Sequence, residues 1–85
     1  MYKNTIIYEI NEKSLIGEDG EKYISFGVDC FEAENGFKKL VNQVVDISVD
    51  LHRVKEFVDK LNEVKLSPEC LYDAVEDFVC EIDWY

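Results

Sequence analysis

The hydrophobic period of this sequence changes once, near residue 48, and that change limits the folds that the chain can adopt. In two runs before this point apolar residues recur at every second position, which is typical of strands with one buried face. After it they recur at spacings of three and four, which is typical of amphipathic helices. A chain that forms strands first and helices second is expected to be an α+β domain with its helices on one face of an antiparallel sheet.

Two strands are predicted at residues 3–12 and 22–32, where the alternation is clearest. Their apolar faces consist of Ile6, Tyr8 and Ile10 in the first run, and of Ile24, Phe26, Val28 and Cys30 in the second. The segment between them contains Gly17 and Gly20, and glycine tolerates the positive φ that a tight reversal requires. The two runs therefore predict an antiparallel hairpin.

A third strand is expected to end near Ile47, after a turn at Asn35-Gly36. The residues from Leu40 to Ile47 fit neither hydrophobic period cleanly, so a short helix is the alternative. Because most of the apolar residues in this segment are β-branched, we favour the strand.

Two helices are predicted after the strands. The apolar stripe of the first is formed by Leu51, Val54, Phe57, Val58, Leu61 and Val64, and Ser48 or Asp50 can cap its start. Ser67 and Pro68 are expected to be the N-cap and first residue of the second. The apolar arc of this second helix is formed by Leu71, Ala74, Val75, Phe78, Val79 and Ile82.

The expected architecture is a single α+β domain over residues 1–85. A three-stranded antiparallel meander is followed by a two-helix hairpin packed on one face of the sheet. A chain of 85 residues can fill only one hydrophobic core, so no boundary is drawn within it.

The charge excludes two classes of partner. Nineteen acidic and nine basic residues give a net charge of −10, which opposes direct binding to nucleic acid phosphates and to anionic membranes.

The sequence has no secretory signal and no run of the roughly 20 apolar residues that cross a bilayer. Three cysteines are an odd number for a disulfide-bonded secreted scaffold. We therefore expect a cytoplasmic protein with reduced thiols.

The charge is distributed unevenly along the sequence. Residues 66–85 contain six acidic residues and no basic one, and on a helix these acids lie opposite the apolar arc. The candidate protein-binding residues are Glu69, Tyr72, Asp73, Glu76, Asp77 and Trp84. Aromatic side chains contribute strongly to interfaces when they lose their contact with water. The alternative is that the acids only keep a small domain soluble, and that Trp84 folds back over the core.

No residue is assigned to catalysis, to a metal or to a cofactor. His52 is the only histidine, which excludes a site with several histidine ligands, and no Cys-x-x-Cys pair is present. There is no glycine-rich phosphate loop and no EF-hand spacing. A two-layer domain of this size also offers little volume for an active site, so we expect a protein that is not an enzyme.

The carboxy-terminal half resembles a known family. The segment Val45-Asp46-Ile47-Ser48, and the later pattern of Ser67-Pro68, Leu71, Asp73 and Glu76-Asp77-Phe78, look like a family of short uncharacterised Firmicutes proteins of unknown function. The resemblance implies a bacterial cytoplasmic setting and carries no activity with it.

Three functional hypotheses follow from these patterns. The first is a small interaction or regulatory module whose acidic helix binds a protein partner, which is expected to be basic. The second is a nucleic-acid mimic that inhibits a DNA-binding protein by presenting carboxylates where phosphates are expected. The third is a homodimer joined through a strand edge or through the helical hairpin.

Overall fold

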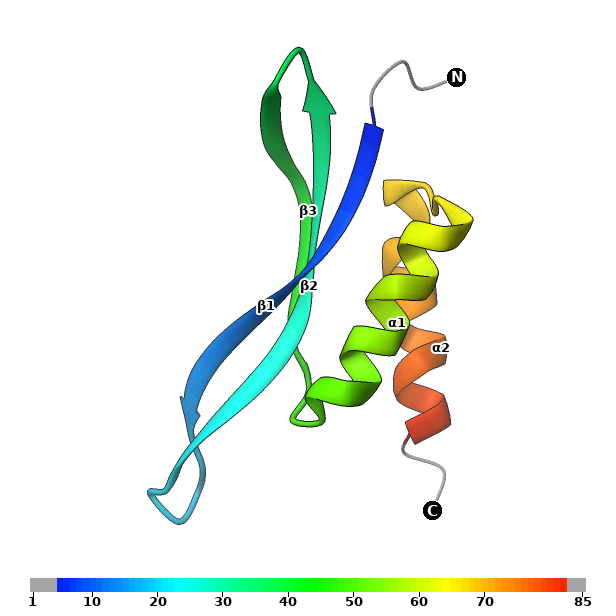
Figure 1. Ribbon diagram of the computed structural model, residues 1–85. Helices are drawn as coiled ribbons and strands as arrows, with labels where there is room; N and C mark the ends of the chain where they lie inside the picture. The colour runs from blue at the N-terminus through cyan, green and yellow to red at the C-terminus, as the bar shows by residue number, and fades with distance from the viewer. Residues whose placement is uncertain (1–4, 83–85) are drawn as a thin grey trace.

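The computed structural model describes residues 5–82, with the side chains of residues 5–80. Three antiparallel strands form an open sheet in the order β1-β2-β3, and two helices pack on one of its faces (Figure 1). The strands are β1 (Thr5–Ile16), β2 (Lys22–Glu34) and β3 (Phe37–Ser48). They are followed by α1 (Leu51–Val64), the short 3₁₀ turn η1 (Pro68–Cys70) and α2 (Leu71–Ile82). The expected fold class is confirmed.

Both predicted turns are present. Asn35 and Gly36 connect β2 to β3 with φ values of 52° and 82°, the left-handed pair that a two-residue hairpin turn requires. In the turn between β1 and β2, Gly20 has a φ of 80° and its N–H donates to the Gly17 carbonyl over 3.0 Å. The β1 strand continues to Ile16, beyond the end predicted near Glu12, so this hairpin is longer than expected.

The third strand is confirmed, and two bulges explain its unclear period. Cys30 pairs with Asn42 and Phe31 with Leu40, which leaves Val41 as an extra residue. Farther along β3, residues 45–47 stand opposite Gly27 alone, and Asp46 has a φ of 56°. Each bulge interrupts the alternation of side chains between the two faces of the sheet.

Gly27 permits β3 to approach β2 closely at the second bulge. A Cβ atom on Gly27 would lie 2.2 Å from the Val44 carbonyl oxygen and 2.8 Å from Cα of Val45. The Asn11 amide, from β1, donates to the same Val44 carbonyl over 3.2 Å. The sheet is therefore folded tightly around Gly27, and only glycine fits there without displacing backbone.

The helix starts differ from each other. Asp50 caps α1 by accepting from the Arg53 N–H over 3.2 Å, whereas the Ser48 hydroxyl accepts from the N–H of Asp50 itself. Ser67 is an N-cap followed by Pro68, as predicted, but of the 3₁₀ turn η1 rather than of α2, and its side chain makes no capping hydrogen bond. The Ser67 carbonyl accepts from the Cys70 N–H over 2.9 Å, which closes a 3₁₀ turn, and α2 begins only at Leu71.

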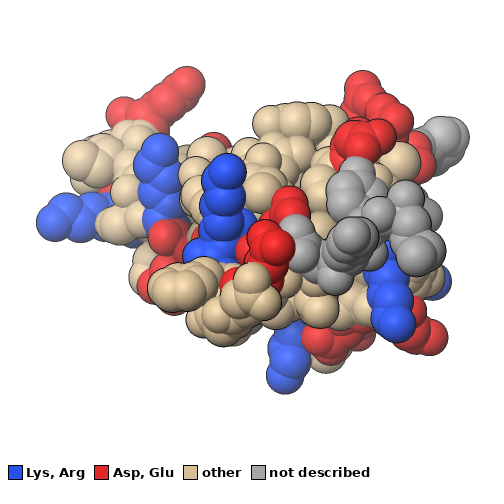
Figure 2. Space-filling view, turned by 90° about the horizontal axis from the view of Figure 1, so that it is seen from above, with Lys and Arg blue, Asp and Glu red and all other residues tan. Residues whose placement is uncertain are grey.

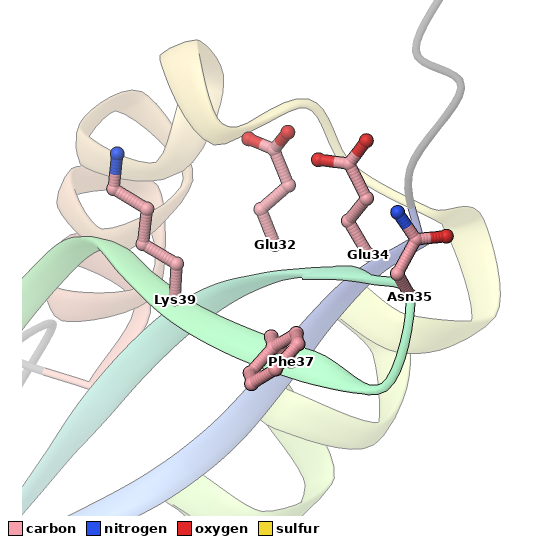
Figure 3. A pocket seen from close by; sticks show the side chains of 5 residues that line it. All are labelled: Glu32, Glu34, Asn35, Phe37 and Lys39. Carbon is pink, nitrogen blue, oxygen red and sulfur yellow. The ribbon is translucent and has the colours of Figure 1, made fainter.

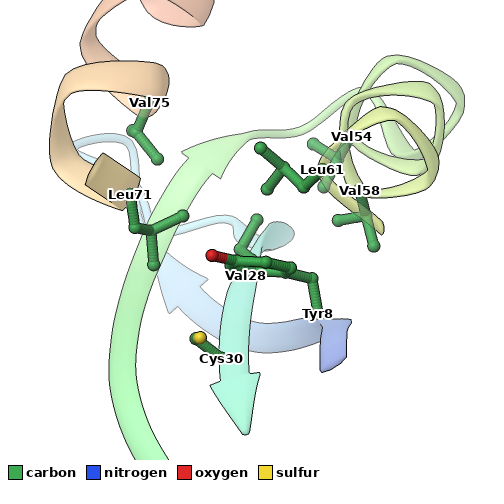
Figure 4. Close-up of a cluster of buried hydrophobic side chains, with 8 residues drawn as sticks. All are labelled: Tyr8, Val28, Cys30, Val54, Val58, Leu61, Leu71 and Val75. Carbon is green, nitrogen blue, oxygen red and sulfur yellow. The ribbon is translucent and has the colours of Figure 1, made fainter. Parts of the chain in front are cut away.

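The core lies between the centre of the sheet and the helices, and its side chains converge from both layers (Figure 4). Its buried hydrophobic members are Tyr8, Val28, Cys30, Val54, Val58, Leu61, Leu71 and Val75. Burial of a large apolar side chain stabilises a fold by about 1.5–3 kcal/mol. The expected burial of Cys30 as a small apolar side chain is confirmed.

Hydrogen bonds fasten the helical hairpin to both edge strands. The Asn62 side chain of α1 accepts from the Tyr8 N–H over 2.8 Å and donates to the Tyr8 carbonyl over 2.9 Å. We call this pair of bonds the Tyr8–Asn62 clamp. The Tyr8 hydroxyl donates to the Leu66 carbonyl over 2.7 Å, and at the opposite edge Asn42 donates to the Pro68 carbonyl over 3.2 Å. These bonds fix the position of both helices over the sheet.

The two hairpins extend beyond the helices at opposite ends of the sheet (Figure 1). Ile24 lies on the helix-facing side of β2, as predicted, but 49% of its surface is exposed because no helix reaches it. Leu51 and Val64, at the two ends of the predicted α1 stripe, are exposed as well. The radius of gyration of 14.0 Å exceeds the roughly 12 Å of a compact chain of this length. Among residues 5–82, no helix is long and apolar enough to cross a membrane.

Candidate functional site

The predicted acidic surface lies on the outer side of η1 and α2. We call the exposed residues Glu69, Asp73, Glu76 and Asp77 the acidic face. Spacings of three and four residues place them on one side of the helical segment. Tyr72 lies beside them with 60% of its surface exposed. Trp84, the remaining predicted site residue, lies outside the described residues.

Among the described residues, Asp73, Glu76 and Asp77 of the acidic face form no ion pair with a cation. Ion pairs within residues 5–82 join Lys38 to Glu9, His52 to Glu56 and Arg53 to Asp50, all of them away from α2. Asp73 lies in the first turn of α2, where a carboxylate is stabilised by the positive end of the helix dipole. Glu76 and Asp77 lie beyond that turn, so helix stability does not account for them.

A shallow apolar groove separates α1 from α2, next to the acidic face. Its apolar lining includes Phe57, Leu61 and Val64 of α1 and Ala74 and Phe78 of α2, around a volume of about 320 Å³. Lys60 lines it on the α1 side and Asp77 on the α2 side. We call it the interhelical groove. Asp77 thus belongs to both the groove and the acidic face.

Two stacked aromatic rings shape this groove. The ring centroids of Phe57 and Phe78 are 4.5 Å apart, with 17° between the ring planes. Sequence reasoning placed both residues on core-facing stripes and missed the groove. The signal in the sequence was the width of the apolar stripes of the two helices. When a stripe is too wide for the sheet to cover completely, the apolar side chains at its margin stay outside the core.

The three thiols occupy different environments, and none forms a disulfide. Cys70 and Cys80 are exposed, the latter as predicted, whereas Cys30 is buried in the core. Burial raises the pKa of the Cys30 thiol above its ordinary value. The hydrogen bond with Tyr8 lowers this pKa in part, and the nearby Glu32 carboxylate adds a smaller rise. A buried thiol with a raised pKa is a poor nucleophile at neutral pH.

His52 is exposed on α1, as expected, and contacts Glu56 over 2.8 Å.

A second pocket, of about 300 Å³, lies at the end of the β2–β3 hairpin. The side chains of Glu32, Glu34 and Lys39 project to the same side of the hairpin, with Phe37 at the strand that follows the turn (Figure 3). Glu32 stands directly opposite Lys39 in the strand register. The Lys39 side chain therefore supplies a positive charge on the same side of the hairpin as the Glu32 and Glu34 carboxylates. Among the described residues, no group of three or more His, Cys, Asp or Glu side chains could hold a metal ion.

Charges of both signs occur elsewhere on the surface. On the face seen in Figure 2, lysine and arginine side chains are interspersed with carboxylates. By contrast, η1 and α2 carry acids and no basic residue. The lack of basic residues is thus a local property of η1 and α2, whereas β1 and β2 carry more acids than bases but include lysines.

The comparisons with known proteins identify a family and no activity. Neither the curated proteins nor the solved structures contain a match to this chain. The family model described as "Family of unknown function (DUF6514)" matches residues 1–81, which is nearly the whole sequence and includes the strands that the sequence resemblance did not cover. The chain therefore belongs to the DUF6514 family, a family of unknown function.

Proposed function

We propose that this protein is a binding module, without a reaction of its own, that docks a basic protein partner on its acidic face. The observation that carries the proposal is the set of exposed carboxylates at Asp73, Glu76 and Asp77, which pair with no cation among the described residues. Unpaired surface carboxylates of one sign steer oppositely charged partners and raise the rate of association. Tyr72 supplies an exposed aromatic side chain that such a partner would bury.

The local character of the charge supports a protein partner over nucleic-acid mimicry. A mimic needs carboxylates along an extended surface, because phosphates follow one another along a duplex. Among the helices and strands here, only η1 and α2 carry acids without any basic residue, whereas the strands and α1 carry charges of both signs, as does the face in Figure 2. The mimic and the homodimer remain as competing outcomes of the experiment.

The experiment is affinity capture with a matched charge control. The tagged protein is compared with Glu76→Lys/Asp77→Lys and with Asp59→Lys/Glu63→Lys, which changes the net charge equally but on exposed positions of α1. We expect a basic protein to be retained by the wild type and by the α1 control and lost from the α2 variant. Equal retention by all three would contradict the proposal.

Two further arms separate the competing functions. Duplex DNA added during capture displaces the partner if the protein is a mimic, and leaves it bound if the acidic face recognises a protein surface. Sedimentation of the free protein distinguishes a monomer from a homodimer.

We also propose a bacterial cytoplasmic setting. Cys70 and Cys80 are exposed and free, which suits a compartment that keeps thiols reduced. Detection of the protein in the soluble cytoplasmic fraction of its native cells, with both thiols open to alkylation, is the expected result. Recovery from the medium or the envelope would contradict it.

A further inference from the structure

The interhelical groove presents an apolar surface that the rest of the described chain does not cover. Residues of α1, α2 and their connection line it, and no strand residue does, so it opens away from the sheet. Leu61 is buried at its base, while 57% of the Val64 surface is exposed at its margin. The stacked rings of Phe57 and Phe78 hold the base in place. The groove is thus formed before any partner arrives.

The two sides of the groove differ in charge. On the α2 side the charged residue that lines the groove is Asp77, which is also part of the acidic face. On the α1 side the charged residue that lines the groove is Lys60, which is exposed. A bound segment would therefore meet the carboxylates of Asp77 and the acidic face along one flank and the ammonium group of Lys60 along the other. This asymmetry defines the chemistry of the occupant.

A groove between two helices with an apolar base suits the apolar edge of a third helix. We infer that the interhelical groove binds an amphipathic helix of a partner protein, with large apolar side chains on its edge and Lys or Arg on the flank that faces α2. The inference rests on the proposed function and names the chemistry of the partner. A second copy of this chain is a poor occupant, because its own last helix would place acids against acids.

The test uses three synthetic 18-residue peptides and the full-length protein, with binding followed by fluorescence anisotropy. The first peptide carries Leu along one edge at helical spacing and Lys on both flanks. The second has Glu in place of Lys, and the third has the composition of the first in an order without an apolar edge. We expect the first to bind at least about tenfold more tightly than either of the others, since tenfold corresponds to about 1.4 kcal/mol.

A pair of valine variants separates the groove from the charge. Val64→Ser removes an apolar side chain from the groove, and Val49→Ser changes a similarly exposed valine, 64% exposed, that does not line it. We expect Val64→Ser to weaken binding of the first peptide about fivefold, from the apolar area lost, and Val49→Ser to leave it unchanged. Equal effects of the two variants would overturn the groove inference.

The outcomes also separate this inference from the proposed function. If Glu76→Lys/Asp77→Lys weakens binding while Val64→Ser does not, the acidic face binds by charge alone and the groove is not used. If Val64→Ser weakens binding while the charge variant does not, the proposed role of the acidic face is wrong. A gain in affinity on Trp84→Ala would show that the chain's own end fills the groove, and a dimer that the peptide dissociates would show that a second copy does. Either result overturns the inference.

Discussion

The centre and the ends of the sheet share one sequence pattern and differ in their surroundings. On β2, Val28 is fully buried under the helices, whereas Ile24, four residues earlier on the same face, is half exposed. The helices, 14 and 12 residues long, span about 18–21 Å, whereas the 13 residues of β2 span about 43 Å. A helical layer of this length can cover only about half of the sheet. Alternation thus predicts which side of a strand is apolar, and the length of the opposing layer decides where that side is buried.

The largest expected effect comes from closing the space at the most crowded point of the centre. Gly27→Ala would place a Cβ atom within 2.2 Å of the Val44 carbonyl oxygen, so the β3 backbone would have to move. We expect a loss of about 3 kcal/mol in the free energy of unfolding, measured by urea denaturation. Gly17→Ala, where φ is not positive, is the matched control and should cost much less. Equal costs for the two variants would mean that β3 does not approach β2 at Gly27 as closely as described.

The comparison itself is tested by truncating one side chain in each region. Val28→Ala should lower the free energy of unfolding by about 2 kcal/mol, because it leaves a cavity under the helices. Ile24→Ala removes more atoms and should cost only about 0.5 kcal/mol, because the position is open to water. The two values come from the same urea denaturation series. A reversed order would show that the hairpin end is covered in solution, for example by a second copy.

The Tyr8–Asn62 clamp should contribute a smaller amount. Asn62→Ala removes two hydrogen bonds to the Tyr8 backbone and should cost about 1.5 kcal/mol, since water can reach part of the vacated site. Asn42→Ala removes the single bond to the Pro68 carbonyl and should cost about 0.5 kcal/mol. Hydrogen exchange of the Tyr8 amide provides a second measurement. Unchanged protection of this amide in Asn62→Ala would argue against the clamp.

The smallest expected effect is a pH dependence at the buried thiol. The pKa of Cys30 is raised in the folded chain, so the folded state keeps its proton at a pH where the unfolded state has lost it. The free energy of unfolding should therefore fall as pH rises past the ordinary thiol value of 9.0. In Cys30→Ala this alkaline loss should be shallower than in the wild type, whereas the exposed-site variant Cys70→Ala should follow the wild type. Parallel curves for all three proteins would contradict the assignment.

Local signals in the sequence predicted the order and type of the elements. The Asn35-Gly36 turn, the Asp50 cap and the switch of period near residue 48 each depend on neighbouring residues alone. The bulges of β3 could not be predicted in this way. Residues 45–47 stand opposite one residue of another strand because Gly27 leaves space there, and that pairing is a tertiary contact.

The candidate site was predicted in part. The acidic face followed from helical spacing, because residues three and four apart share a side of a helix. The interhelical groove did not follow, since it depends on how closely α1 and α2 approach each other and on the stacking of Phe57 with Phe78. Ser67 shows the same limit, because a serine before a proline can start either an α-helix or a 3₁₀ turn.

The Tyr8–Asn62 clamp also bears on when the chain can fold during its synthesis. Its partners are 54 residues apart, and the Tyr8 hydroxyl bonds to a carbonyl 58 residues away. Until α1 has been made, the outer edge of β1 at Tyr8 has unpaired backbone groups that could join a strand of another molecule. Once Asn62 is in place, its side chain forms hydrogen bonds with the N–H and carbonyl of Tyr8, as a neighbouring strand would. A single side chain near the end of α1 thus prevents β1 from adding foreign strands at this position, and it can do so only after most of the chain has been synthesised.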